Sequence, residues 1–222
     1  KKIIKSNFEN KNLNYLFEFF KTDKSNKEHG FAIFYEKHLK YFRKSEINIL
    51  EIGAGKGASA AAFGAYFEKS KIFSMDNHIE NFAYQSENIF PVLIDSSNEK
   101  SIIKFYNKIP KKKYFFDLII EDGSHRLNDI LLSIKYHFKK IKPGGYFVLE
   151  DYLFPNYFDH CNNNSNEIKI DEMIQKIKKK FFFPSEILDK EFQNYLFENI
   201  DFISEYKGKT QISDICFIKK RV

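Results

Sequence analysis

The chain has 222 residues, of which 43% are apolar and 30% charged, enough to form one α/β domain with a full core. Its two cysteines, Cys161 and Cys216, lie far apart without metal-ligand spacing, which argues against a disulfide framework or a zinc site and favours a reducing cytoplasm. No apolar run can cross a membrane, no secretory leader is visible, and the lysines behind the net charge of +6 lack a nucleic-acid-binding pattern. We therefore expect the lysine runs at 111–113, 139–140 and 178–180 to be solvated.

Two helices are predicted ahead of the first strand. Residues 7–21 and 31–42 each place apolar side chains at helical spacing, and a polar break at 22–30 separates them. We expect residues 1–45 to form a helical flank beside the core, where substrate contacts are common. Three side chains of this flank could reach a ligand, although an ordinary structural role is the more frequent one: Lys24, His29 and Tyr35.

A glycine loop follows the first predicted strand. Residues 47–52 form a short apolar run rich in β-branched side chains, which suits a strand buried on both faces of a parallel sheet. The run ends in Gly53, Gly55 and Gly57, and residues 58–67 have helical composition. A strand that stops in such a loop leaves backbone N–H groups free to face a ligand.

The ligand of this loop has two readings. Gly53, Gly55 and Ala58 satisfy the G-x-G-x-x-G/A dinucleotide fingerprint, and Asp76 follows at a distance that suits ribose hydroxyls, so a nicotinamide enzyme is one possibility. Glu51 favours the other reading, because a carboxylate there repels a pyrophosphate but tolerates a cationic ligand without phosphate.

The rest of the chain predicts a doubly wound parallel sheet closed by an antiparallel hairpin. Strands are expected at 72–75, 89–94, 115–120 and 146–149, helices at 98–107 and 128–140, and a Pro-Gly-Gly turn at 142–145. Beyond residue 152 we expect helices at 171–180 and 185–198, burial of Phe181, Phe182 and Phe183, and two late strands at 201–206 and 213–219. The prediction is a single domain, with a cofactor-binding core at 46–152 and helices plus a hairpin at 153–222.

Acidic and small polar residues follow the predicted strands, and in this architecture the strand ends share one crevice. Asp122, Glu150 and Asp151 offer hard oxygen ligands of the kind that Mg²⁺ prefers. A bound divalent ion lowers the pKa of a substrate hydroxyl, and His125, three residues after Asp122, could take the proton. Each of these side chains could instead belong to a solvated strand end or a helix cap.

The sequence E-x-G-x-G-x-G resembles the first motif of class I S-adenosylmethionine-dependent methyltransferases. Over about residues 22–152 the chain is also similar to bacterial Mg²⁺-dependent sugar O-methyltransferases of macrolide pathways and their relatives in surface-glycan clusters. The similarity lies in T-D-K-S-N-K-E-H-G-F-A-I-F-Y-E, L-E-I-G-A-G-K-G, D-S-S, I-I-E-D-G-S-H-R, and I-K-P-G-G followed by V-L-E-D-Y. Phe31 is a departure, since relatives often carry Tyr after H-G.

The resemblance implies a seven-stranded Rossmann-like sheet with the last strand antiparallel, and O-methylation of a small hydroxylated acceptor such as a sugar. It implies Mg²⁺ at Asp122, Glu150 and Asp151, with His125 as the base. The S-adenosylmethionine site would comprise Glu51, Gly53, Gly55, Gly57, Asp76, Asp95, Ser96 and Glu121. We expect a small-molecule substrate, no nucleic acid or membrane partner, and a possible homo-oligomer. A nicotinamide oxidoreductase, a metal-free methyltransferase and a binding module without turnover remain as alternatives.

Overall fold

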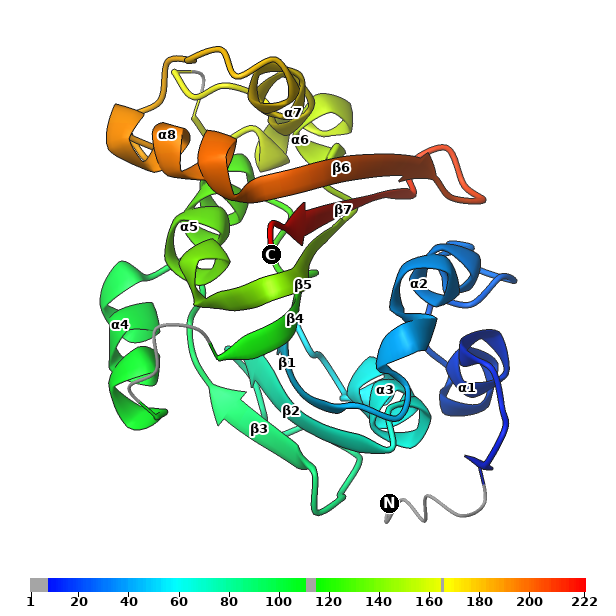
Figure 1. Ribbon diagram of the computed structural model, residues 1–222. Coiled ribbons are helices and arrows are strands. Elements are labelled where there is room, and N and C mark those ends of the chain that lie inside the picture. The colour runs from blue at the N-terminus through cyan, green and yellow to red at the C-terminus, as the bar shows by residue number, and fades with distance from the viewer. Residues whose placement is uncertain (1–7, 111–114, 165) are drawn as a thin grey trace.

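A computed structural model describes residues 8–110, 115–164 and 166–222 (Figure 1). The lysine run at 111–113 lies outside the described residues. Seven strands form one sheet: β1 Glu46–Ile52, β2 Lys69–Asp76, β3 Ile89–Leu93, β4 Phe116–Glu121, β5 Ile141–Glu150, β6 Ile200–Lys207 and β7 Asp214–Lys220.

The strand order is β3-β2-β1-β4-β5-β7-β6. The five strands from β1 to β5 pair in parallel, β7 lies antiparallel to β5, and β6 lies antiparallel to β7. The predicted sheet and its closing hairpin are therefore confirmed. Because the chain runs outward from β1 to β3 and then returns to β4 on the other side of β1, the strand order reverses between β1 and β4. In such sheets ligands bind outside the carboxyl ends of the strands at this point.

Helices cover both faces of the sheet (Figure 1). The helices are α1 Leu13–Phe20, α2 Ala32–Leu39, α3 Ala58–Tyr66, α4 Glu99–Lys108, α5 Leu127–His137, α6 Phe154–Tyr157, α7 Ile170–Lys178 and α8 Lys190–Asn199, with 3-10 turns at Lys40–Phe42, Phe138–Lys140 and Asp159–Cys161. In the described part of the chain, no helix is long and apolar enough to span a lipid bilayer.

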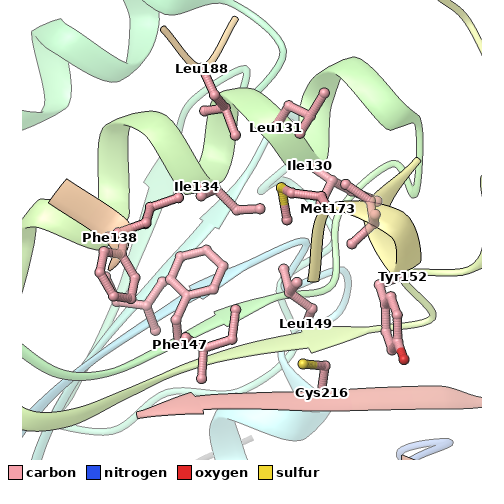
Figure 2. Close-up of a cluster of buried hydrophobic side chains, with 14 of the residues drawn as sticks. Ile130, Leu131, Ile134, Phe138, Phe147, Leu149, Tyr152, Met173, Leu188 and Cys216 are labelled. Carbon is pink, nitrogen blue, oxygen red and sulfur yellow. The ribbon is translucent and has the colours of Figure 1, made fainter. Parts of the chain in front are cut away.

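Alternate residues of each central strand point to different cores. In β4, Leu118 and Ile120 belong to a cluster with α1, α2 and α3, whereas Ile119 faces the cluster built with α4, α5, α7 and α8. Figure 2 shows part of the second cluster, where Ile134 and Phe138 lie against Phe147 of β5. Both faces of the central strands β1 and β4 are thus largely buried, as the apolar run at 47–52 predicted for β1.

Three local expectations were wrong. The Pro-Gly-Gly segment 142–145 lies within β5, where pairing with β4 skips from Ile141 to Tyr146, so the segment is an irregularity inside the strand. Helix α8 begins at Lys190 rather than at 185, because the side chain of Asp189 caps it by accepting the N–H of Phe192. Of the Phe181–Phe183 run, Phe181 and Phe182 are 58% and 49% exposed, and Phe183 alone is buried.

Candidate active site

The glycine loop lies at the carboxyl end of β1 and leads into α3. Gly53 has φ +83°, and a Cβ there would lie 1.8 Å from the carbonyl oxygen of Asp122, so a larger residue cannot fit beside the end of β4. Gly55 has φ +51°, and a Cβ there would meet nothing within 4 Å. Its N–H donates to Asp76 Oδ2 at 2.8 Å. The loop therefore packs tightly against the end of β4 at Gly53, whereas at Gly55 it faces open space.

A cavity of about 520 Å³ lies beside this loop. Its lining comes from the end of β2, the loops after β1, β2, β3 and β4, the first turn of α5 and the 3-10 turn Asp159–Cys161. The lining residues are Gly53, Asp76, Asn77, Asp95, Ser96, Ser97, Gly123, Ser124, Arg126, Asp129 and His160. Four of these were predicted cofactor contacts, namely Gly53, Asp76, Asp95 and Ser96. Sequence reasoning missed Arg126, Asp129 and His160, and no motif marks the last of them.

The other four predicted contacts do not line the cavity: Glu51, Gly55, Gly57 and Glu121. Both glutamates are buried. Among the described residues, neither oxygen of Glu51 has a hydrogen-bond partner, and Oε2 of Glu121 has none. Burial raises the pKa of Glu51 to about 7, although the positive charge of Lys24 opposes the shift, and burial raises the pKa of Glu121 to about 8. Oε1 of Glu121 accepts the N–H of Gly123 at 3.2 Å, so the oxygens left without a partner are both of Glu51 and one of Glu121, at the ends of the two strands that flank the crevice.

An acidic cluster stands at the ends of β4 and β5. Asp122, His125 and Asp151 each offer one possible ligand atom, and these atoms all lie within 4.8 Å of one another. Glu150, the third predicted metal ligand, is engaged elsewhere: Oε2 accepts a hydrogen bond from Lys24 Nζ at 2.7 Å, and Oε1 accepts one from the Tyr35 hydroxyl. The structure thus brings His125, rather than Glu150, together with the two aspartates.

Two residues of the N-terminal flank, Lys24 and His29, reach this acidic cluster, and a third, Tyr35, reaches Glu150 beside it. Besides Glu150, Lys24 Nζ contacts Asp122 Oδ2, and His29 Nδ1 lies 3.7 Å from Asp151 Oδ2. Burial by itself lowers the pKa of Lys24, but the carboxylates of Asp122 and Glu150 outweigh this and raise it well above its ordinary value. The flank is therefore part of the candidate site.

The backbone of the cluster is strained at two positions. His125 has φ +57° and Asp151 has φ +50°, in the left-handed region that side chains other than glycine rarely adopt. The peptide N–H of Asp151 is held by the carbonyl of Asp214 at 2.7 Å. Such outliers gather at functional sites, where the surrounding structure over-determines them.

His125 lies partly buried beside Asp122 and an aromatic ring. Its Nε2 is 3.8 Å from Asp122 Oδ1, and its ring centroid is 4.6 Å from that of Phe154. Burial lowers the pKa of the imidazole, against the opposing effect of the Asp122 carboxylate. The neutral imidazole, which can accept a proton, is therefore the favoured form near neutral pH.

No family model matches the chain. In sequence it is similar to demethylmacrocin O-methyltransferase of Streptomyces fradiae, with 27% identity over 166 residues that cover 72% of this chain and 40% of the relative. It is also similar to L-olivosyl-oleandolide 3-O-methyltransferase of Streptomyces antibioticus, with 29% identity over 146 residues that cover 63% and 36% of the two chains. The chain spans less than half the length of these curated relatives.

Solved structures agree on the fold. The MycE methyltransferase of the mycinamycin biosynthetic pathway, solved in complex with Mg, SAH and mycinamycin VI, matches with a TM-score of 0.73 and 20% identity over 95% of this chain and 54% of that one. An rRNA methylase from Streptococcus thermophilus matches with a TM-score of 0.53 and 14% identity over 85% and 95% of the two chains.

The sheet order, with β7 antiparallel between β5 and β6, is that of a class I S-adenosylmethionine-dependent methyltransferase, as predicted. In sequence the chain is similar to the two O-methyltransferases named above.

Proposed function

We propose that this protein is an S-adenosylmethionine-dependent O-methyltransferase that acts on a hydroxyl group of a sugar or sugar conjugate. One observation carries the proposal. Gly123 and Ser124 line the cavity beside the glycine loop, and their neighbours in the chain, Asp122 and His125, belong to the cluster that could hold a metal ion. The turn after β4 thus joins the cavity to a group of side chains that could bind a metal ion or accept a proton.

The residues present fit the cofactor. The open space at Gly55 leaves room for a ligand against the backbone, and Asp76, Asp95 and Ser96 offer oxygen acceptors or donors around the cavity. Asp76 would hold the ribose hydroxyls and Gly53 and Gly55 would lie against the ligand, with Gly57 opening α3 behind them. A cation bound in the cavity would favour the ionised forms of Glu51 and Glu121, whose pKa values burial raises to about 7 and about 8. When bound, S-adenosylmethionine supplies a methyl group on a positively charged sulfur.

The residues present also fit a divalent cation. Asp122 and Asp151 would hold it. Glu150, next to Asp151 in the chain, accepts hydrogen bonds from Lys24 and Tyr35 instead. When bound, Mg²⁺ or a similar ion lowers the pKa of a hydroxyl that coordinates to it. We assign His125 Nε2 the role of the base, since the neutral imidazole faces Asp122 and can hold the proton that the acceptor hydroxyl loses.

The relatives support a sugar acceptor, because the name of one of them, L-olivosyl-oleandolide 3-O-methyltransferase, specifies a glycosylated acceptor. The pathway to which this chain belongs, natural-product or surface-polysaccharide, is a separate matter, and we propose either as the source of the sugar. Arg126 and His160 line the same cavity and would contact the acceptor. Both cysteines are unpaired, which suits work in the reducing cytoplasm.

Calorimetry and a transfer assay test the proposal. S-adenosylhomocysteine should bind while NAD does not, and the reverse result would restore the oxidoreductase alternative. Labelled S-adenosylmethionine should then donate its methyl group to a member of a panel of nucleotide sugars and glycosides. If transfer persists in excess EDTA, the enzyme is a metal-free methyltransferase, and if S-adenosylhomocysteine binds without transfer to any acceptor in the panel, the sugar assignment is wrong.

A further inference from the structure

Lys24 is a buried cation that the proposed chemistry does not use. Resting on the proposed function, we infer that its ammonium is a built-in counter-cation of the acidic site. It satisfies Glu150 and one oxygen of Asp122, so that the other oxygen of Asp122 is left to a divalent ion, and the site stays folded when no ion is bound. Lys24 is in this sense a positioning residue, and it also limits how tightly the site binds a metal.

The two oxygens of Asp122 face different partners. Oδ2 contacts Lys24 Nζ, while Oδ1 lies 3.8 Å from His125 Nε2, on the side of the candidate metal ligands. The same ammonium lies 2.7 Å from Glu150 Oε2, and the side chains of Lys24 and Glu150 are each only 2% exposed. Lys24 therefore engages Asp122 Oδ2 and Glu150 Oε2, and it leaves Asp122 Oδ1, the oxygen near His125, for an ion.

The backbone around Lys24 fixes where its ammonium lies. The carbonyl of Lys24 accepts the N–H groups of Phe31 and Ala32, each at 3.1 Å, and its own N–H donates to Thr22 Oγ1 at 3.2 Å. The segment is also tied to the closing hairpin, because Lys209 N donates to the carbonyl of His29 at 2.7 Å. A lysine is normally a mobile charge, but here both its stem and its surroundings are held.

Charge explains why a cation is needed at this place. Glu51, Asp122, Glu150 and Asp151 converge on the ends of three adjacent strands, and all but Asp122 are almost completely buried. Around the ammonium the facing groups are these acids, Asp23, and the neutral hydroxyl of Tyr35 on Glu150. Buried carboxylates without a nearby positive charge are strongly unfavourable.

A metal ion and Lys24 should therefore substitute for each other in part. If the ammonium is removed, the carboxylates lose their compensating charge, and the protein should come to depend on a divalent ion for stability. The same change removes a positive charge a few ångströms from the ion, so the affinity for the ion should rise.

The test compares Lys24→Met with Lys27→Met, a control in the same loop whose ammonium pairs with Glu18 but is 73% exposed. Thermal unfolding is measured in EDTA and in Mg²⁺, and Mn²⁺ binding is measured by electron paramagnetic resonance. In EDTA, Lys24→Met should melt about 10 °C below wild type, since breaking a buried ion pair costs several kcal/mol. Mg²⁺ should restore most of that loss, and Mn²⁺ should bind about tenfold more tightly or better. Lys27→Met should match wild type in both measurements.

If Lys24→Met does not fold, the double variant Lys24→Met, Glu150→Gln removes one negative charge together with the positive one and keeps an acceptor for Tyr35. It should fold and still show the stronger Mn²⁺ binding. Wild-type melting and Mn²⁺ affinity in Lys24→Met, weaker Mn²⁺ binding, or a double variant that also fails to fold would overturn the inference. None of these readouts requires methyl transfer, so they can fail while S-adenosylhomocysteine still binds, and the reverse also holds.

Discussion

The two glycines at the turn after β1 give a matched pair of substitutions. Gly53→Ala should damage both the fold and the ligand site, because a Cβ at Gly53 would lie 1.8 Å from the carbonyl oxygen of Asp122. Real Cβ contacts rarely fall below 3.0 Å, so the chain would have to open by about 1.2 Å between the ends of β1 and β4. The shift would move Asp122 itself, the first residue of the acidic cluster.

The magnitude follows from two costs. A left-handed conformation costs about 1–2 kcal/mol for a residue with a Cβ. Forcing extra volume into a packed place costs about 1–3 kcal/mol more. Gly53→Ala should therefore lower the free energy of unfolding by about 2–5 kcal/mol. Gly55→Ala carries the first cost alone, since its Cβ would meet nothing within 4 Å, and should lose about 1–2 kcal/mol.

Urea unfolding and calorimetry with S-adenosylhomocysteine separate the two variants. Gly53→Ala should be the less stable protein and should lose ligand binding. Gly55→Ala should stay folded yet bind the ligand at least about tenfold more weakly, because its methyl group enters the space that we assign to the cofactor. The reasoning fails if the two variants are equally stable, or if Gly55→Ala binds the ligand as wild type does.

His125→Ala should lower kcat by about 10²- to 10⁴-fold in a methyl-transfer assay, the usual effect of losing a general base, while Mn²⁺ affinity stays near wild type; a fall in Mn²⁺ affinity would make the imidazole a ligand instead. Asp151→Asn should weaken Mn²⁺ binding measured by electron paramagnetic resonance, because the amide keeps the shape and removes a negative charge, and unchanged binding would place the ion elsewhere. Burial lowers the pKa of His137 to about 3. Between about pH 6.5 and 3 the unfolded chain therefore binds a proton that the folded chain does not, so the free energy of unfolding decreases as the pH is lowered. By about pH 5 the wild type has lost about 2 kcal/mol of its free energy of unfolding through this residue. His137→Phe has no imidazole to titrate, so the difference in free energy of unfolding between it and wild type, measured in urea, should be about 2 kcal/mol smaller at pH 5 than at pH 7.

The fold could be predicted because its signals are local and repeated. The apolar run of β1 and the glycine loop after it identify a strand entering a helix, and four more such runs demand a parallel sheet. The short link between β6 and β7 forces them to be antiparallel. The predicted boundaries of elements were wrong where a single side chain determines them. Asp189 ends the irregular segment before α8, and the apolar content of residues 181–183 did not indicate that two of the three rings would face solvent.

The candidate site could be predicted only as far as topology reaches. The strand ends must meet, so Asp76, Asp95 and Asp122 could be grouped from the chain order alone. Side-chain direction is a different matter. Glu150 ends β5 and points into the interior, while Asp151, one residue later and in a left-handed conformation, turns toward His125. Both acids are buried, and the sequence did not indicate which of them would face Lys24 and Tyr35 and which would face His125.

The described part of the N-terminal flank packs directly on the predicted cofactor-binding core. Phe17 of α1 and Tyr35 of α2 pack edge to face with Phe63 of α3, so the flank shares a hydrophobic core with the first helix after the glycine loop. The hydroxyl of that same Tyr35 reaches Glu150. The packing that seats the flank on the sheet therefore also delivers a hydrogen bond and, through Lys24, a positive charge to the end of β5. A carboxylate at the end of β5 can be buried because residues far away in the sequence fold over it, and the acidity of the site depends on the flank as much as on the sheet.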